Sequence, residues 1–109
     1  MDNKHPALLI ASDFIKANLH LRMTMVDLKH HTKFSERSLQ LIFKKHLNKS
    51  PFEYIEEQRL LKAHELIKQY KQSKKTTHIA KEVGFRHLGR FSVNFKKRFG
   101  IHPSVLARS

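Results

Sequence analysis

The chain has 109 residues, of which 39% are hydrophobic, with three glycines, three prolines and no cysteine. This composition excludes a disordered tail, an all-β fold rich in turn residues, and any site that needs a disulfide or a thiolate ligand, and it favours a helical domain. The formal net charge of +13 predicts a polyanionic partner, with nucleic acid favoured over an anionic membrane surface or a heparin-like polymer.

Three helices are expected before residue 50. Residues 7–19 have the apolar spacing of an amphipathic helix. Thr24 is expected to cap a second, short helix, and Ser35, with Ser38 three residues later, to cap a third. Apolar residues recur on one face of the third helix: Leu39, Ile42, Phe43 and Leu47.

A long helix is expected next, from Pro51 to Tyr70, because this stretch contains no further glycine or proline. A helix of about 19 residues spans roughly 28 Å, close to the ~34 Å between successive major-groove turns on one face of DNA. His64 and Glu65 are expected to form a surface pair on this helix, and the polar residues 72–75 to connect it to the next element.

Two further helices and a closing segment follow. Thr77 is expected to cap a short helix that ends at Gly84, since glycine can adopt the left-handed conformation of a helix end. The next helix should run from about Leu88 to Phe99 and stop at Gly100. The apolar residues of this helix fall on one face: Leu88, Phe91, Phe95 and Phe99.

The chain also contains an internal repeat. The stretch Phe43-Lys44-Lys45 recurs as Phe95-Lys96-Lys97, and Pro51 recurs as Pro103, at an offset of 52 residues. Each copy is expected to form a helix, a short turn and a second helix, which is typical of a helix-turn-helix motif.

The sequence therefore predicts an all-α fold of about seven helices. Two helix-turn-helix subdomains, over residues 8–50 and 76–105, would be joined by a long linker helix over residues 51–70. Motifs in both copies resemble the AraC/XylS family DNA-binding domain. The similar residues are, in the first copy and the linker, Leu28, Ser35, Leu39, Phe43, Lys44, Arg59, Leu60, Ala63 and Leu66, and in the second copy, Ile79, Ala80, Val83, Gly84, Phe85, Phe91, Ser92, Phe95, Lys96, Gly100, Pro103 and Ser104.

The resemblance extends over about residues 8–105, so the chain, 1–109, is identified as one domain of this type. It implies recognition helices at Ser35–His46 and Leu88–Arg98 that enter successive major grooves of one DNA duplex. It also implies a bacterial, cytoplasmic and nucleoid-associated transcription regulator, more often an activator that contacts RNA polymerase. The chain is then either a short stand-alone regulator or a fragment of a longer one with an N-terminal effector or dimerisation domain.

Candidate DNA contacts lie on the outward faces of the two recognition helices. The candidate base contacts are Arg37, Gln40, Leu41, Arg90 and Asn94, and the candidate phosphate contacts are Ser35, Lys44, Lys45, Arg86, Lys96, Lys97 and Arg98. Arg37 and Gln40 resemble family base-contact positions, and their donors match guanine and adenine edges. Leu41 is expected either to touch a thymine methyl or to be an ordinary exposed leucine. For Arg90 and Asn94, phosphate contact is favoured over base reading.

The second recognition helix departs from the family pattern. Leu88, Gly89 and Val93 stand where relatives often present polar side chains that read bases. The best contact available to these residues is apolar, to a thymine methyl. We therefore expect base reading mainly from the first recognition helix, and phosphate anchoring and shape reading from the second.

Other classes of function are less favoured. The domain type also occurs fused to DNA-repair activity, but that chemistry needs a cysteine nucleophile, and no Ser/His/acid set stands out, so no enzymatic activity is expected. The histidines lack HExxH spacing and His30 and His31 are adjacent, so no metal or other cofactor is expected. No apolar run reaches the roughly 20 residues that cross a bilayer, so no membrane partner is expected. The open alternative is non-specific polyanion binding by a basic helical domain.

Overall fold

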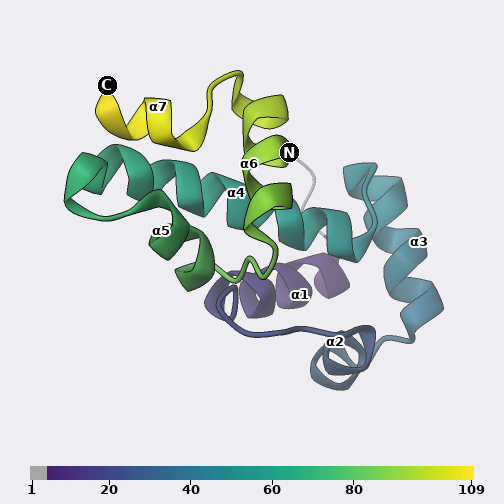
Figure 1. Ribbon diagram of the computed structural model, residues 1–109. Helices are drawn as coiled ribbons and strands as arrows, with labels where there is room; N and C mark the ends of the chain where they lie inside the picture. Colours follow the sequence, from purple (N-terminus) through teal and green to yellow (C-terminus); the bar gives the residue numbers. More distant parts are fainter. Residues whose placement is uncertain (1–4) are drawn as a thin grey trace. The chain divides into compact units, whose positions relative to one another are not determined.

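The structure, a computed structural model, describes residues 5–109 of the chain (Figure 1). Over these residues it contains seven α-helices, one 3-10 helix and no strand. The elements are α1 (Pro6–Ala17), α2 (Met25–Thr32), α3 (Glu36–Leu47), α4 (Pro51–Tyr70), η1 (Lys71–Ser73), α5 (Thr76–Glu82), α6 (Leu88–Phe99) and α7 (Pro103–Arg108). The predicted all-α fold is confirmed, with the helix-turn-helix pairs α2–α3 and α5–α6 and the long helix α4 between them in the chain.

The first compact unit comprises Met1–Glu57 and uses α1, α2, α3 and the beginning of α4. Its core consists of Ala7, Leu8, Ala11, Ile15, Met23, Leu28, Leu39, Phe43, Tyr54 and Ile55. The Ser12 and Tyr54 hydroxyls form a buried hydrogen bond of 2.7 Å that joins α1 to α4. The rings of Phe43 and Tyr54 meet edge to face, with centroids 5.6 Å apart. These contacts fix which side of α3 faces the core.

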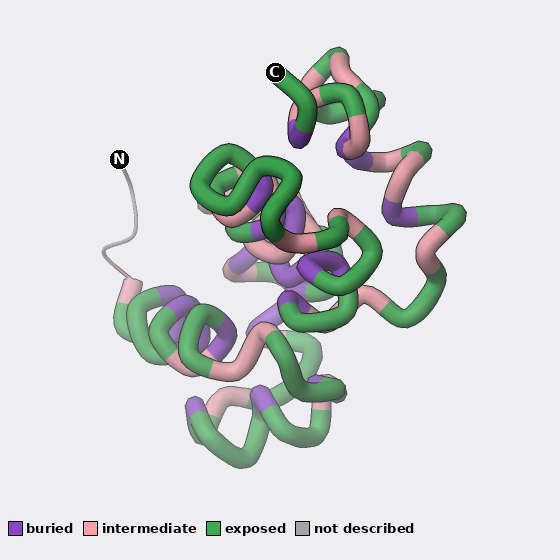
Figure 2. Tube along the Cα trace, turned by 60° about the vertical axis from the view of Figure 1, so that its left-hand side comes forward, coloured by how far each residue is buried: buried purple, intermediate pink, exposed green. Residues whose placement is uncertain are grey.

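The second compact unit comprises Gln58–Ser109 and uses the rest of α4 together with η1, α5, α6 and α7. Its core consists of Leu60, Ala63, Ile67, Ile79, Ala80, Val83, Phe91, Phe95 and Ala107. Within α6, the Phe95 ring lies 5.5 Å from that of Phe91 and 4.7 Å from that of Phe99. Buried and exposed segments alternate along the helices of each unit, so each helix places one face on its own core (Figure 2).

Polar side chains start the helices of the first unit where the sequence predicted them. The Asp27 amide donates to Thr24 Oγ1 at 3.2 Å, while the Thr24 amide donates to the Asp27 carboxylate at 2.9 Å, which forms a complete capping box at α2. The Ser38 amide donates to Ser35 Oγ at 3.1 Å and caps α3. These bonds satisfy amides that have no partner within the first turn of a helix.

Several helices end in the left-handed conformation. Asn48 follows α3 with φ of 56°, and Gly100, 52 residues later, follows α6 with φ of 76°. Lys33 ends α2 with φ of 67°, although it has a Cβ that disfavours this region. The repeat therefore preserves the backbone turn after α3 and after α6, with asparagine in one copy and glycine in the other.

Two details of the sequence prediction are wrong. Helix α5 begins at Thr76, and its cap is Lys75, which makes no side-chain capping bond, so Thr77 lies inside the first turn instead of capping the helix. His64 forms no surface pair with Glu65, since the Glu65 carboxylate lies 3.4 Å from Lys62 Nζ. The His64 ring instead packs on Phe99, with centroids 4.3 Å apart.

The environment of His64 disfavours its charged form. Burial against the aromatic side chains lowers the pKa of the His64 imidazole below its ordinary value, and the nearby positive charges of Lys68 and Arg98 lower this pKa further. The ring also stacks on Phe95 at 5.9 Å. Neutral His64 is thus part of the packing between α4 and α6 within the second unit.

Candidate nucleic-acid interface

Helix α3 presents a polar and basic face opposite its core residues. Leu39 and Phe43 are buried completely, and because the helix turns by about 100° per residue, the side opposite them carries residues 37, 41 and 44. The five predicted contact residues within α3 are all exposed: Arg37, Gln40, Leu41, Lys44 and Lys45. The structure thus brings the predicted residues of the first recognition helix onto one solvent-facing surface.

Ser35 differs from the other predicted contacts of the first unit. Its hydroxyl accepts the Ser38 amide and donates its own hydrogen to Ser38 Oγ at 2.9 Å. A serine hydroxyl has one hydrogen to donate. A phosphate contact by the Ser35 hydroxyl would therefore replace its bond to Ser38.

Helix α6 also places its aromatic residues inside and its basic residues outside. Phe91 and Phe95 are buried, whereas Gly89, Arg90 and Val93 are exposed on the opposite side. Helix α6 contains four basic residues and no acidic residue; Arg90, Lys96 and Lys97 lie on this outer side, whereas Arg98 lies close to His64 and Phe99 on the side of the core. This face has the charge that attracts a phosphate backbone.

Three residues around α6 are placed differently from their neighbours. Leu88 is half-buried and packs against the core of the second unit, so it belongs to the inner face. Asn94 is also half-buried and already has an interaction partner. Arg86 is exposed in the turn that precedes α6. Of the polar candidates in this half of the chain, Arg86 and Arg90 are therefore more accessible than Asn94.

The two lysine pairs of the repeat lie exposed near the ends of their recognition helices. Lys44 and Lys45 on α3, and Lys96 and Lys97 on α6, form no ion pair within residues 5–109. Arg98 next to them is also exposed, but its guanidinium lies 5.0 Å from the centroid of the Phe99 ring. Lys45, Lys96 and Lys97 thus present their charges to solvent without an ion-pair partner. Lys44 differs, because the pKa of the Glu53 carboxylate is lowered by a hydrogen bond from the Ser50 amide and also by the nearby charge of Lys44.

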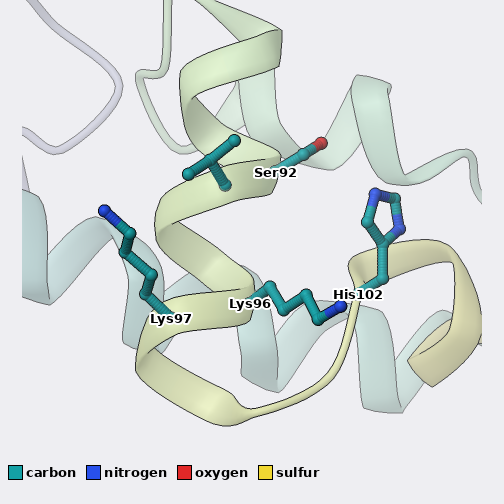
Figure 3. Close-up of a pocket in the computed structure, with 5 residues that line it drawn as sticks. Ser92, Lys96, Lys97 and His102 are labelled. Carbon is teal, nitrogen blue, oxygen red and sulfur yellow. The ribbon is translucent and has the colours of Figure 1, made fainter.

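A pocket of about 430 Å³ lies on the outer surface of α6 (Figure 3). It is lined by Ser92, Val93, Lys96 and Lys97 of α6 and by His102 of the turn before α7. Lys96 extends toward the segment that carries His102, whereas Lys97 leaves the other side of the helix. Sequence reasoning missed Ser92 and His102 as parts of this surface, because only the packing of α7 brings residue 102 next to α6.

Hydrogen bonds hold His102 in place at the edge of this pocket. The Ser104 amide donates to His102 Nδ1 at 3.3 Å, and the Ser104 hydroxyl lies 2.9 Å from the same atom. An accepting Nδ1 leaves the proton of the neutral ring on Nε2. His102 therefore both caps α7 and presents an N–H donor away from Ser104.

Residues 5–109 contain neither a candidate metal site nor a candidate membrane-spanning helix. No group of three or more histidine, aspartate or glutamate side chains there could hold a metal ion. None of the helices in that range is long and apolar enough to span a membrane.

Comparison with known proteins identifies several relatives. Residues 28–109 match the model of a helix-turn-helix domain family. The chain is 32% identical to the HTH-type transcriptional regulator ArgR of Pseudomonas aeruginosa, over 94% of the chain and 31% of that protein. It is 33% identical to the XylDLEGF operon transcriptional activator of Pseudomonas putida, over 87% of the chain and 30% of that protein. The chain thus spans about a third of the length of these curated relatives.

Solved structures show the same arrangement of helices. A probable AraC family transcriptional regulator from Rhodopseudomonas palustris superimposes with a TM-score of 0.87 at 27% identity, covering 95% of this chain and 96% of that one. A transcriptional regulator with an AraC-type DNA-binding domain from Chromobacterium violaceum superimposes with a TM-score of 0.86 at 29% identity, covering 94% of this chain and 89% of that one.

Proposed function

Because the chain belongs to the AraC/XylS family of helix-turn-helix transcription regulators, we propose that it binds double-stranded DNA sequence-specifically through α3 and α6. The observation that carries this proposal is the pair of equivalent helices, each with an aromatic side chain fixed in a core and a basic face toward solvent. The main proposed base contacts are Arg37 and Gln40 on α3. Leu41 on α3 and Arg90 and Asn94 on α6 are further proposed base contacts.

The proposed phosphate contacts are Ser35, Lys44, Lys45, Arg86, Lys96, Lys97 and Arg98. Phosphate contacts release counterions, so log K should fall by about 0.9 per contacted phosphate for each unit of log salt concentration. Changing Lys97 to alanine should weaken the binding of all DNA sequences alike and flatten this slope by about one contact. A slope near zero for the intact chain would exclude DNA binding.

Sequence specificity is tested by selecting bound sites from random duplex DNA. A specific regulator should enrich a defined motif. Arg37→Ala should reduce the preference for one base of that motif over the other bases by about 1–3 kcal/mol. A non-specific polyanion binder, the alternative, would enrich no motif and would bind heparin and random DNA equally well. Its support is the +13 charge alone, whereas specific binding also has Arg37 and Gln40 on one exposed face.

We also propose that α3 and α6 occupy successive major grooves, and that the bound protein activates transcription through RNA polymerase. The groove proposal is supported by the single uninterrupted 20-residue helix α4 between the two motifs. Inserting about 5 bp between the two subsites should then cost most of the specific affinity, because it turns one subsite away. Activation is supported by the relative described as an activator, and transcription in vitro with purified polymerase tests it.

A further inference from the structure

Each recognition helix carries one large apolar side chain in the middle of its outer face. Leu41 on α3 is 56% exposed and Val93 on α6 is 55% exposed. The two positions are 52 residues apart, which is the offset of the repeat, and each precedes a lysine pair by the same spacing. Within each unit, the apolar residue points away from the core that Phe43 or Phe95 occupies.

The surroundings of Val93 form an apolar recess with basic margins. The pocket on α6 has Val93 in its lining, together with the side chains of Lys96 and Lys97, whose long stems are hydrocarbon up to the ammonium group. Ser92 and His102 add a hydroxyl and a ring at one side of the pocket (Figure 3). Gly89, one turn earlier on the same side, has no heavy atom within 4 Å of an added Cβ, so the backbone there is open to a close approach.

The chemistry of this recess limits what it can recognise in a DNA groove. Val93 has neither a donor nor an acceptor, so it cannot pair with the polar edges of guanine, adenine or unmethylated cytosine. The apolar group in the major groove is the methyl on C5 of thymine. A methyl on C5 of cytosine occupies the same place on the pyrimidine ring. The lysine ammonium groups at the margins suit the phosphates on either side.

We infer that the Val93 recess binds the C5-methyl group of a pyrimidine, thymine or 5-methylcytosine, in the subsite that α6 occupies. This inference rests on the proposed function, because it requires α6 to enter a major groove. It makes Val93 a specificity-determining residue that senses one methyl group, and it makes the binding of the protein sensitive to cytosine methylation at one position. An acidic segment of a partner protein is the competing occupant, and the experiment below distinguishes it.

The test uses the complete chain and the duplex that it selects from random DNA. Each thymine of the α6 subsite is replaced in turn by deoxyuridine, which removes only the methyl group. One such replacement should weaken binding about fourfold, which corresponds to ~0.8 kcal/mol for one buried carbon group. With Val93→Ala the difference between the thymine and uracil duplexes should shrink to less than about twofold, because alanine lacks the two Cγ methyl groups that would reach the thymine methyl.

Leu41→Ala provides the matched control, since Leu41 has the same place in the other copy of the repeat. This variant should leave the thymine-to-uracil effect in the α6 subsite unchanged. A second arm places cytosine or 5-methylcytosine at the sensitive position, and methylation should recover about the same fourfold for the intact protein but not for Val93→Ala. Both variants change exposed residues, so equal unfolding curves are expected for all three proteins.

Specific binding without any uracil effect in the α6 subsite would overturn the inference and leave the proposed function standing. A selected motif with no pyrimidine at any position of that subsite would also overturn it. A chain that binds no duplex specifically would overturn both. If Val93→Ala leaves all DNA affinities unchanged but lowers polymerase-dependent transcription, the recess belongs to a protein partner and the inference is wrong.

Discussion

Replacing Phe95 by alanine should unfold the second unit while the first unit stays folded. Phe95 has no exposed surface, and its ring contacts Phe91, Phe99 and His64. Such a truncation in a packed core costs about 3–5 kcal/mol. The second unit has 52 residues, from Gln58 to Ser109, and at about 0.05–0.15 kcal/mol per residue its whole stability is only ~3–8 kcal/mol. The free energy lost in Phe95→Ala is therefore comparable with the whole free energy of unfolding of the second unit.

Phe43→Ala is the matched variant, because Phe43 occupies the equivalent position of the repeat and is also completely buried. Amide NMR spectra report each unit separately. In Phe95→Ala the signals of α5, α6 and α7 should collapse toward random-coil positions while those of α1, α2 and α3 persist. In Phe43→Ala the pattern should be reversed. On DNA, each variant should lose protection of one subsite and keep the other.

Loss of the signals of both units together in either variant would contradict this prediction. That result would mean that the two cores fold as one cooperative structure through α4, which contributes Tyr54 and Ile55 to one core and Leu60 and Ala63 to the other. A loss of less than about 1 kcal/mol in Phe95→Ala would refute the packing argument itself.

Two further predictions concern stability. Lys33→Gly should raise the free energy of unfolding by about 0.5–1 kcal/mol in urea, because glycine adopts the left-handed conformation without the strain of a Cβ. The control, Lys29→Gly inside α2, should lower the free energy of unfolding by up to ~1 kcal/mol. Equal effects of the two substitutions would contradict this prediction. The folded state holds the pKa of His64 below its value in the unfolded chain, so the unfolded chain binds more protons on acidification. The contribution of His64 to stability is therefore present above pH ~6.5 and is lost as the pH falls through the folded pKa. His64→Phe should flatten the dependence of Tm on pH between 7.5 and 5, and an unchanged dependence would contradict this.

The helices and most of their ends could be predicted because local chemistry determines them. Thr24 and Ser35 accept an amide three residues ahead, and this depends on nothing beyond the first turn of the helix. Asn48 and Gly100 tolerate the left-handed conformation wherever they occur. The same holds for the outward face of α3, since the positions of its buried apolar residues determine which side faces solvent.

The errors arose where distant parts of the chain decide the outcome, or where two adjacent residues are equally suited to one position. His64 looks like a surface residue in sequence, but Phe99, 35 residues later, covers it. Thr76 and Thr77 are adjacent and chemically alike, so the start of α5 depends on the extended backbone of Lys75. Likewise, the pocket on α6 required the position of His102, which no spacing within α6 could reveal.

The differences between the two copies of the repeat indicate how binding is divided between them. Core positions stay apolar, since both copies need a packed helix, and the lysine pairs stay identical, as the proposed phosphate contacts of both helices require. The polar positions of the outer face have diverged: Arg37 corresponds to Gly89 and Gln40 corresponds to Ser92 at the offset of 52. Phosphate contacts carry no sequence information, whereas side chains at these diverged positions can. We therefore expect α3 to recognise its subsite by hydrogen bonds to bases, and α6 to recognise its subsite by contact with a methyl group and by the shape of the DNA.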